Sequence, residues 1–238
     1  MTIKDKIDYA MKCKTAQWSL AENIFTKKDN VFLETDKIFF GVVTFGYNAL
    51  IVADREIINW CTETLSDLPS NGILGCEYLY IIEKKLREYG KKLDGDYSRY
   101  LHLYPEQKVE KPQGFNFELY EKGKIPAELY ADGCFNHSLD YDEKNELLAI
   151  VAKSGEEIAS IAAVNNCGSG LWDVGIDTID KYRGKGLAAY LVKTMALESE
   201  KRNQVPLYTT WHPNIASTRA ALRAGFSPVW VEYLSENL

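Results

Sequence analysis

The sequence predicts a protein of the α/β (α+β) class, and three patterns in the chain carry that prediction. Apolar residues recur at helical spacing in residues 4–25. Apolar runs at residues 147–152 and 158–164 flank the turn-forming segment 153–157, which is typical of a β-hairpin. A strand-like run at residues 172–179 leads directly into a glycine-containing turn and a helical pattern. The chain has 238 residues, 46% of them hydrophobic, which is enough to bury a sizeable core.

The first half of the chain predicts a smaller α/β lobe without a catalytic signature. After the first helix, three β-rich runs suggest a small antiparallel meander, with strands at residues 31–33, 38–45 and 49–52. Asp54 is a candidate N-cap for a helix that continues to Leu65. A second helix is expected at residues 74–89 and stops at Gly90, because glycine commonly follows the last helical turn.

The best candidate for a domain boundary is the polar, Pro- and Gly-containing segment 108–114. The region before it, residues 91–112, reads as irregular except at residues 97–104. We therefore expect an N-terminal lobe of unknown role at residues 1–110 and a second domain at residues 113–238.

In the second domain the pattern of strands and helices is clearer. Its helices are expected at residues 126–130, at 215–223 and from Leu187 onward, where Leu191 and Met195 continue an apolar stripe. Its strands are expected at residues 115–119, 147–152, 158–164, 172–179, 207–211 and 229–233.

Composition excludes several classes of function. The net charge of −6 and the pI near 5.3 argue against nucleic-acid binding, which needs an excess of Lys and Arg. The first ten residues lack the apolar core of a signal peptide, and no apolar run approaches the roughly 18 residues that cross a bilayer. We therefore expect a cytoplasmic protein with neither nucleic acid nor membrane as partner. The cysteines show no metal-binding spacing, so they read as reduced thiols and no metal is expected: Cys13, Cys61, Cys76, Cys134 and Cys167.

The turn after the strand at residues 172–179 has the features of an anion site. A strand that ends in a glycine-rich turn and opens a helix presents unpaired backbone N–H groups at the positive end of the helix dipole. Small residues let a pyrophosphate approach the main chain, and two cationic side chains add positive charge. The segment consists of Arg183, Gly184, Lys185, Gly186, Leu187 and Ala188. A plain helix start that needs glycine for a tight turn remains an equal alternative for the hexapeptide alone.

A third interpretation treats residues 184–189 as Gly-x-Gly-x-x-Ala, the dinucleotide fingerprint of an oxidoreductase. Only about 50 residues follow this motif, too few for the remaining strands of such a domain. Arg183 also has no role in that scheme.

Together with a second motif downstream, this segment resembles the GNAT superfamily of N-acetyltransferases. The segment fits the Arg/Gln-x-x-Gly-x-Gly/Ala signature, and Asn214 and Gly225-Phe226 stand where the superfamily's second motif has its Asn and its Gly-Phe. The resemblance covers residues 113–238 and implies a mixed, mostly antiparallel sheet flanked by helices. Trp211, Asn214 and Ser217 look like the branch that includes zwittermicin-resistance acetyltransferases.

The resemblance also implies a binding mode for acetyl-CoA. The strand before the glycine loop bulges and splays from its neighbour, and its main chain at Ile176 and Thr178 would bind the pantetheine arm. Backbone amides of residues 183–188 would bind the pyrophosphate. Asn214 would contact the pantetheine or the thioester end, with Ser217 one helical turn later on the same face. Asn214 also suits a helix N-cap, and the two roles are compatible.

One position departs from the family pattern. Many GNAT enzymes have a tyrosine four residues before the Gly of Gly-Phe, and its hydroxyl protonates the departing thiolate of coenzyme A; here that position is Ala221. Three alternatives remain open. Another group protonates the thiolate, the thiolate leaves without a dedicated acid, or the protein is not a competent transferase. A thiol of pKa about 8.5 is a tolerable leaving group near neutral pH, so activity need not be lost.

The general base is not evident from the sequence. Trp172 and Val174 occupy strand positions that often face the acceptor in the family, and neither titrates. Asp173 and Asp177 share the opposite face by strand alternation, where a solvated or salt-bridged role is favoured. His212 follows a predicted strand near the thioester and is a weak candidate. A base that acts through a water molecule is a further alternative.

The sequence therefore predicts an acetyl-CoA-dependent N-acetyltransferase that acetylates a primary amine of a small-molecule acceptor. A non-catalytic acyl-CoA-binding module is the second hypothesis, and a dinucleotide-dependent oxidoreductase is the third. The identity of the acceptor and the oligomeric state do not follow from the sequence.

Overall fold

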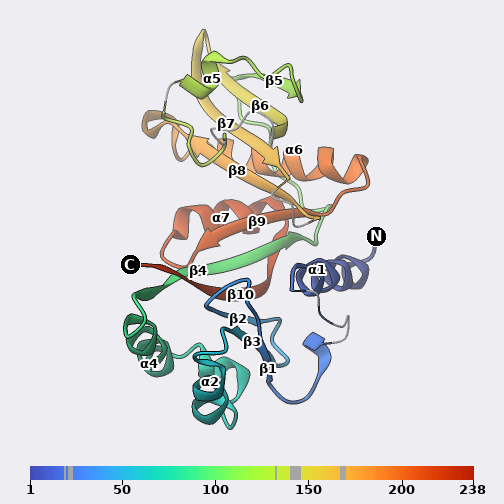
Figure 1. The fold of residues 1–238 in the computed structure, drawn as a ribbon. Helices are drawn as coiled ribbons and strands as arrows, with labels where there is room; N and C mark the ends of the chain where they lie inside the picture. The colour runs from blue at the N-terminus through green and yellow to red at the C-terminus, as the bar shows by residue number, and fades with distance from the viewer. Residues whose placement is uncertain (19, 21–23, 132, 140–145, 167–169) are drawn as a thin grey trace. The chain divides into compact units, whose positions relative to one another are not determined.

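The structure is a computed structural model that describes residues 1–18, 20, 24–131, 133–139, 146–166 and 170–238. It has the predicted mixed α/β class, with a largely antiparallel sheet flanked by helices (Figure 1). The chain forms two compact units, each built from separated stretches. Unit 1 contains Met1–Lys6 and Tyr100–Pro228, and unit 2 contains Ile7–Arg99 and Val229–Leu238. Cys167 lies outside the described residues.

Unit 1 carries the glycine loop and the hairpin that the sequence predicts. Its strands follow the order β9-β8-β7-β6-β5, in which β5 to β8 are antiparallel neighbours and β8 and β9 run parallel. The elements are β5 (Asn116–Glu121), α5 (Glu128–Ala131), β6 (Glu146–Ser154), β7 (Glu157–Asn165), β8 (Trp172–Thr178), η2 (Asp180–Tyr182), α6 (Leu187–Lys201), β9 (Pro206–Trp211) and α7 (Ile215–Ala224).

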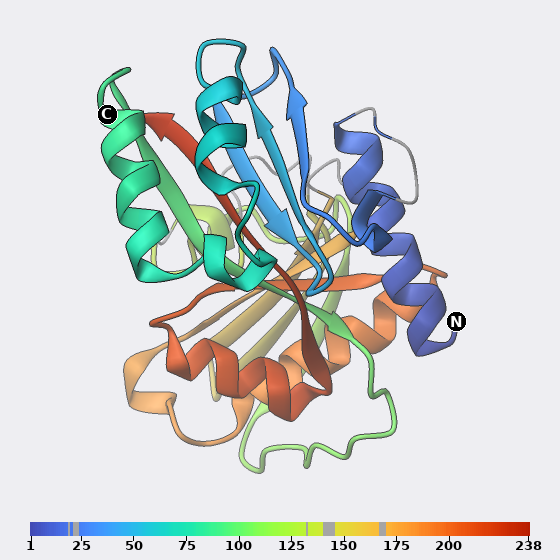
Figure 2. The same ribbon diagram turned by 90° about the horizontal axis from the view of Figure 1, so that it is seen from below.

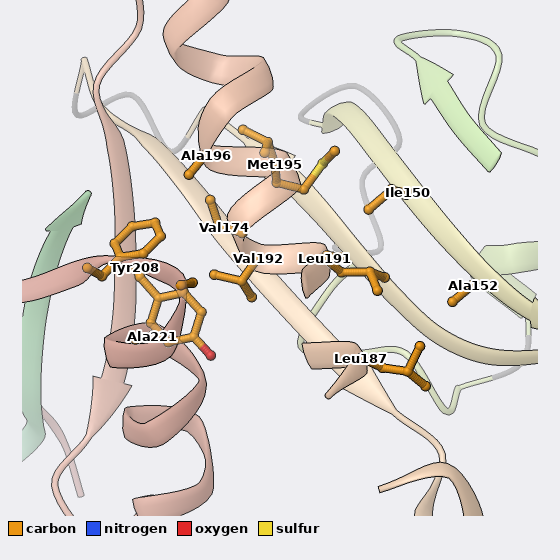
Figure 3. Close-up of a cluster of buried hydrophobic side chains, with 14 of the residues drawn as sticks. Ile150, Ala152, Val174, Leu187, Leu191, Val192, Met195, Ala196, Tyr208 and Ala221 are labelled. Carbon is orange, nitrogen blue, oxygen red and sulfur yellow. The ribbon is translucent and has the colours of Figure 1, made fainter. Parts of the chain in front are cut away.

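Helix α6 packs on one face of this sheet through the apolar stripe that its sequence predicts. Leu187, Leu191 and Met195 are fully or almost fully buried, and Figure 3 shows them over β6 and β8. Val174 of β8 and Tyr208 of β9 belong to the same hydrophobic cluster. The packing of α6 therefore fixes the position of this helix relative to β8, and the glycine loop lies between the two elements.

Unit 2 combines a second group of strands with four helices. Its strand order is β1-β3-β2-β10-β4. Helices α2, α3 and α4 cover one face through a buried cluster that includes Ile51, Ile57 and Leu86 (Figure 2). The elements are α1 (Ile3–Gln17), η1 (Ile24–Thr26), β1 (Val31–Glu34), β2 (Phe40–Thr44), β3 (Ala49–Ala53), α2 (Ile58–Leu65), α3 (Ser70–Ile73), α4 (Cys76–Arg87), β4 (Lys91–His102) and β10 (Phe226–Asn237), of which α1, β4 and β10 continue into unit 1.

The expected meander at residues 31–52 is wrong in one pairing. Strands β2 and β3 form the antiparallel hairpin, but β1 pairs with β3 in parallel instead of with β2. The physical reason is that β10 occupies the free edge of β2, with Val231 opposite Thr44 and Leu234 opposite Gly41. A partner almost 190 residues away leaves no local signal in the sequence.

The expected irregular character is also wrong for residues 91–96, because residues 91–102 form the long strand β4. The strand pairs with β10 in the sheet, and its polar side chains form ion pairs such as Arg99 with Glu232, whose charged atoms lie 2.6 Å apart. Two helix boundaries differ as well. The first helix, expected at residues 4–25, ends at Gln17. Asp54 is not the N-cap of α2: its carboxylate accepts a hydrogen bond from the amide of Glu56 in a turn, and α2 begins at Ile58.

The boundary expected at residues 110–113 stays a prediction about independently folding domains. The compact units divide the chain differently, because strands β4 and β10 pass from one unit to the other. Within the described ranges, no helix combines the length and apolar character needed to span a membrane.

Candidate functional site

Strands β8 and β9 separate shortly after they begin. They pair in parallel only at Trp172 with Pro206 and at Asp173 with Leu207. Beyond Asp173 the described residues give β8 no strand partner on this edge, and Figure 3 shows the two strands diverging below Val174 and Tyr208. The expected divergence is therefore present. The expected bulge is not, because β8 keeps one continuous register with β7 from Asp173 to Thr178.

The main-chain groups of Ile176 and Thr178 point to the open edge of β8. The amide of Trp172 donates to the carbonyl of Val205 on the β9 side, at 3.1 Å. Because main-chain groups alternate between the two edges of a strand, every second residue after Trp172 faces the same side. A ligand in an extended conformation can therefore bind this edge of β8 through main-chain hydrogen bonds like the one between Trp172 and Val205.

The glycine loop leaves its amides open at the start of α6. Gly184 and Gly186 have φ values of +78° and +81°, a conformation that favours glycine. A Cβ atom at Gly184 would meet nothing within 4 Å, and one at Gly186 would meet only Pro112, at 4.0 Å. Gly186 is the N-cap and makes no side-chain capping bond, and the first helical bond comes from the amide of Tyr190. The preceding amides thus have no acceptor within the helix and can bind an anion.

The two cationic side chains of the loop are held without buried partners. Arg183 is largely exposed and pairs with Asp180 at 3.0 Å, while its Nε lies 3.4 Å from the carbonyl of Thr178. Lys185 lies over the ring of Tyr182, 5.1 Å from its centroid. Both charges are exposed to solvent, so they add attraction for an anion but do not shape the site.

At the start of α7, Asn214 serves as the N-cap that the sequence predicts. Its side-chain oxygen accepts a hydrogen bond from the amide of Ser217 at 3.1 Å. The hydroxyl of Ser217 lies 2.7 Å from the hydroxyl of Tyr208 on β9. The side-chain amide of Asn214 keeps its donor group for a ligand, so the capping and binding roles remain compatible.

Ala221 is fully buried in the cluster that contains Tyr208 and Phe226. The helix then ends at Gly225, with a φ of +95°. A Cβ atom at Gly225 would clash with the carbonyl oxygen of Tyr104, which explains the glycine of the Gly-Phe pair. At position 221 the side chain is only a methyl group, so this position of α7 provides no acidic group.

The two faces of β8 have different surroundings. Val174 is buried in the cluster that includes the apolar residues of α6, and the partly buried Trp172 packs against the same cluster. Asp173 and Asp177 lie on the opposite face. The carboxylate of Asp173 accepts a hydrogen bond from the hydroxyl of Thr209 at 3.0 Å, where the pairing of β8 and β9 ends.

Asp177 has a structural role that the sequence did not reveal. Its carboxylate accepts three hydrogen bonds, from the amides of His137 and Ser138 and from the hydroxyl of Ser138, at 2.8 to 3.0 Å. A Cβ atom at Gly175 would clash with the carbonyl of His137, so the loop lies directly on the main chain of β8. Asp177 thus anchors this loop through neutral donors, rather than being solvated or joined to a cation.

His212 follows β9 in an exposed turn. It lies between Trp211, which is exposed, and the N-cap Asn214. His212 thus lies just after the carboxyl end of β9, the strand that separates from β8. Its assignment as a base stays a prediction.

Comparison with known proteins gives the family of the chain. The sequence model of the GNAT acetyltransferase family matches residues 103–230, more than half of the chain. The chain therefore belongs to the GNAT acetyltransferase family. A search of curated proteins found no match.

Solved structures with a similar fold are distant in sequence. They include a chain from Novosphingobium aromaticivorans assigned to the GNAT family as an acetyltransferase, with 15% identity, a TM-score of 0.47, and coverage of 61% of this chain and 66% of that one. An acetyltransferase of the GNAT family from Colwellia psychrerythraea has 12% identity and a TM-score of 0.44, with 62% and 57% covered. A GCN5-related N-acetyltransferase from Kribbella flavida has 15% identity and a TM-score of 0.47, with 63% and 60% covered. The match thus spans less than two thirds of each of these chains.

The dinucleotide interpretation of residues 184–189 is wrong. Strand β8, which precedes the loop, is antiparallel to β7 from Asp173 to Thr178 and pairs in parallel with β9 only at Trp172 and Asp173. The dinucleotide fold instead needs parallel neighbours around its glycine-rich turn.

Proposed function

We propose that the protein transfers the acetyl group of acetyl-CoA to a primary amine of a small-molecule acceptor. One observation carries the proposal: the open amides of Gly184 to Ala188 begin α6 at the end of the strand whose edge separates from β9. Coenzyme A contains a diphosphate and an extended arm with amide groups. The diphosphate requires unpaired N–H groups, and the arm requires an unpaired strand edge.

The residues of the loop fit the pyrophosphate of coenzyme A. Backbone amides of residues 184–188 would hold it, whereas the amide of Arg183 already donates to the carbonyl of Asp180 at 3.1 Å. The open space over Gly184 and Gly186 gives the phosphate oxygens access to the main chain. The main chain of Ile176 and Thr178 would bind the pantetheine arm, and Asn214 and Ser217 would contact its thiol end. When bound, acetyl-CoA supplies an activated thioester whose carbonyl carbon accepts the amine.

We propose Asp173 as the residue that accepts the proton of the amine. It stands where β8 and β9 part, and the hydroxyl of Thr209 fixes its carboxylate at 3.0 Å. A carboxylate held at such a point can act directly or through one water molecule. His212 remains the second candidate, because it follows the carboxyl end of β9, where the gap between β8 and β9 is open.

The finer assignments are also proposals. Trp211, Asn214 and Ser217 support placement in the branch that includes zwittermicin-resistance acetyltransferases, which would make the acceptor a small polar amine. A cytoplasmic location is also part of the proposal, and it fits the reduced cysteines that the sequence predicts.

A second candidate function is a GNAT module that binds acyl-CoA without catalysis. The buried Ala221 favours it, because the position that often carries the acid is filled by a methyl group. The two functions predict the same binding of coenzyme A and differ only in turnover.

The test is a screen of the intact protein with acetyl-CoA against a panel of primary amines, read as free thiol. Amine-dependent thiol release, with one acetyl group recovered on the amine for each thiol, supports the transferase. Tight binding of acetyl-CoA without release above the amine-free control supports the binding module. Absence of acetyl-CoA binding contradicts both.

A further inference from the structure

The hydroxyl groups of Tyr208 and Ser217 form a pair beside the position that Ala221 leaves without an acid. Tyr208 comes from β9 and Ser217 from the first turn of α7, and their oxygens lie 2.7 Å apart. Ala221 stands one helical turn after Ser217, on the same face of α7. Figure 3 shows the side chain of Tyr208 next to Ala221, and both belong to one buried cluster.

A large side chain at position 221 would compete with Tyr208 for the same space. Tyr208 is among the largest fully buried side chains, and its ring contacts Phe226, with the ring centroids 5.7 Å apart. Cores are packed closely enough that one bulky group replaces another rather than joining it. The phenol therefore enters this part of the core from the strand, while the helix contributes only a methyl group.

Either hydroxyl can donate in this pair, and one of the two directions leaves a donor for a ligand. The amide of Ser217 is already bound to Asn214, which fixes the first turn of α7. Tyr208 is buried, whereas Ser217 is only half-buried, so Ser217 presents the outer hydroxyl. If Tyr208 donates to the oxygen of Ser217, the Ser217 proton points outward to an acceptor.

We infer that Tyr208 and Ser217 together form a relayed hydrogen-bond donor that stabilises the sulfur of coenzyme A as it leaves the acetyl group. This inference rests on the proposed function. In the step, the acceptor nitrogen bonds to the acetyl carbon, the carbon–sulfur bond breaks, and its electron pair goes to sulfur. The proton of the amine passes to Asp173 or to water, and Ser217 donates a hydrogen bond to the thiolate while it accepts one from Tyr208.

The chemistry suits donation of a hydrogen bond rather than of a proton. Burial, followed by smaller effects of Asp173, Asp177 and Tyr100, raises the pKa of Tyr208 to about 12, although the bond to Ser217 opposes the shift. The phenol thus keeps its proton near neutral pH. A thiol has a pKa of about 8.5, so the thiolate can leave the site by taking a proton from solvent.

The experiment compares three variants of the full chain in the acetyl-transfer assay. Tyr208→Phe removes only the hydroxyl, and Ser217→Ala removes the outer donor. Tyr120→Phe is the matched control, because its hydroxyl bonds to Glu118 on β5, away from the gap between β8 and β9. Binding of coenzyme A and thermal stability are measured for each, together with kcat and KM for acetyl-CoA.

We expect kcat to fall about tenfold in Tyr208→Phe and about 10- to 100-fold in Ser217→Ala, the range for a hydrogen bond to a charged group. KM for acetyl-CoA should change by less than about threefold, because the bond strengthens only as charge develops on sulfur. The loss in Tyr208→Phe should be the same from pH 6 to pH 9. Ser217→Thr, which keeps a hydroxyl, should restore most of kcat, and Tyr120→Phe should behave as the native protein does.

Native kcat in both Tyr208→Phe and Ser217→Ala overturns the inference and leaves the proposed function in place. A rise in KM with unchanged kcat also overturns it, because it assigns the pair to binding alone. If Tyr208→Phe does not fold, Ser217→Ala and its Thr rescue decide the matter. If the native protein transfers no acetyl group to any amine, the proposed function and this inference fail together.

Discussion

The substitution Gly186→Val tests whether the main chain at the start of α6 holds the cofactor. Gly186 has a φ of +81°, and the direction of its missing Cβ is open, with only Pro112 at 4.0 Å. A valine there places two methyl groups over amides that have no acceptor within the helix. Any anion that approaches these amides must displace the side chain.

Two effects of this substitution have to be separated. A non-glycine residue in the left-handed region costs about 1–2 kcal/mol, and this strain lowers stability whether or not a ligand binds. A ligand that binds only the native state adds about 2.7 kcal/mol at a hundred times its dissociation constant. For a chain of this size, 2.7 kcal/mol corresponds to roughly 5–10 °C in Tm.

The assay is thermal unfolding with and without acetyl-CoA, and Gly123→Val is the matched control. Gly123 has a φ of +73°, and its Cβ would also meet open space, but it lies in the turn after β5. We expect both variants to lose a similar amount of Tm without ligand, while only Gly186→Val loses the rise on adding acetyl-CoA. Lys185→Ala should weaken binding by about fivefold or less, because an exposed charge is screened. Nicotinamide cofactors should give no shift. A folded Gly186→Val protein that acetyl-CoA still stabilises would remove the loop from the site.

Three further outcomes follow from the same geometry. Asp173→Asn should lower kcat at least about 100-fold with little change in coenzyme A affinity, and unchanged kcat would exclude it as the base. The free energy of unfolding should fall between pH 10 and pH 12 by roughly 2 kcal/mol more in the native protein than in Tyr208→Phe, because the phenol ionises near 10 when unfolded and at about 12 when folded. Parallel urea midpoints across that range would contradict the burial of this hydroxyl. Gly225→Ala should destabilise by more than about 2 kcal/mol and Gly123→Ala by only about 1 kcal/mol, since the first meets the carbonyl of Tyr104 and the second open space. Equal denaturation midpoints for the two would show that the clash is relieved without loss.

The sequence predicted the parts of the site that depend on neighbouring residues. The glycines of the loop, the stripe of α6 and the cap at Asn214 each follow from local chemistry within one turn of chain. The hairpin of β6 and β7 was predicted for the same reason, because its strands flank a short turn.

Features that depend on distant partners could not be predicted. Strand β10 takes the edge of β2 that a local meander would give to β1, and only the three-dimensional structure reveals this competition. The pair formed by Tyr208 and Ser217 joins a strand to a helix, and neither residue type signals it alone. Asp177 likewise binds a loop 40 residues earlier in the chain, although a carboxylate on a strand usually suggests solvent or an ion pair.

A crystal structure of the full chain with coenzyme A would locate the ligand without reference to activity. We expect the diphosphate oxygens within hydrogen-bond distance of the amides of residues 184–188, and the pantetheine arm along Ile176 and Thr178 in the gap between β8 and β9. We expect the sulfur near the hydroxyl of Ser217. Coenzyme A bound elsewhere, with the loop amides open to solvent, would contradict the assignment of this site.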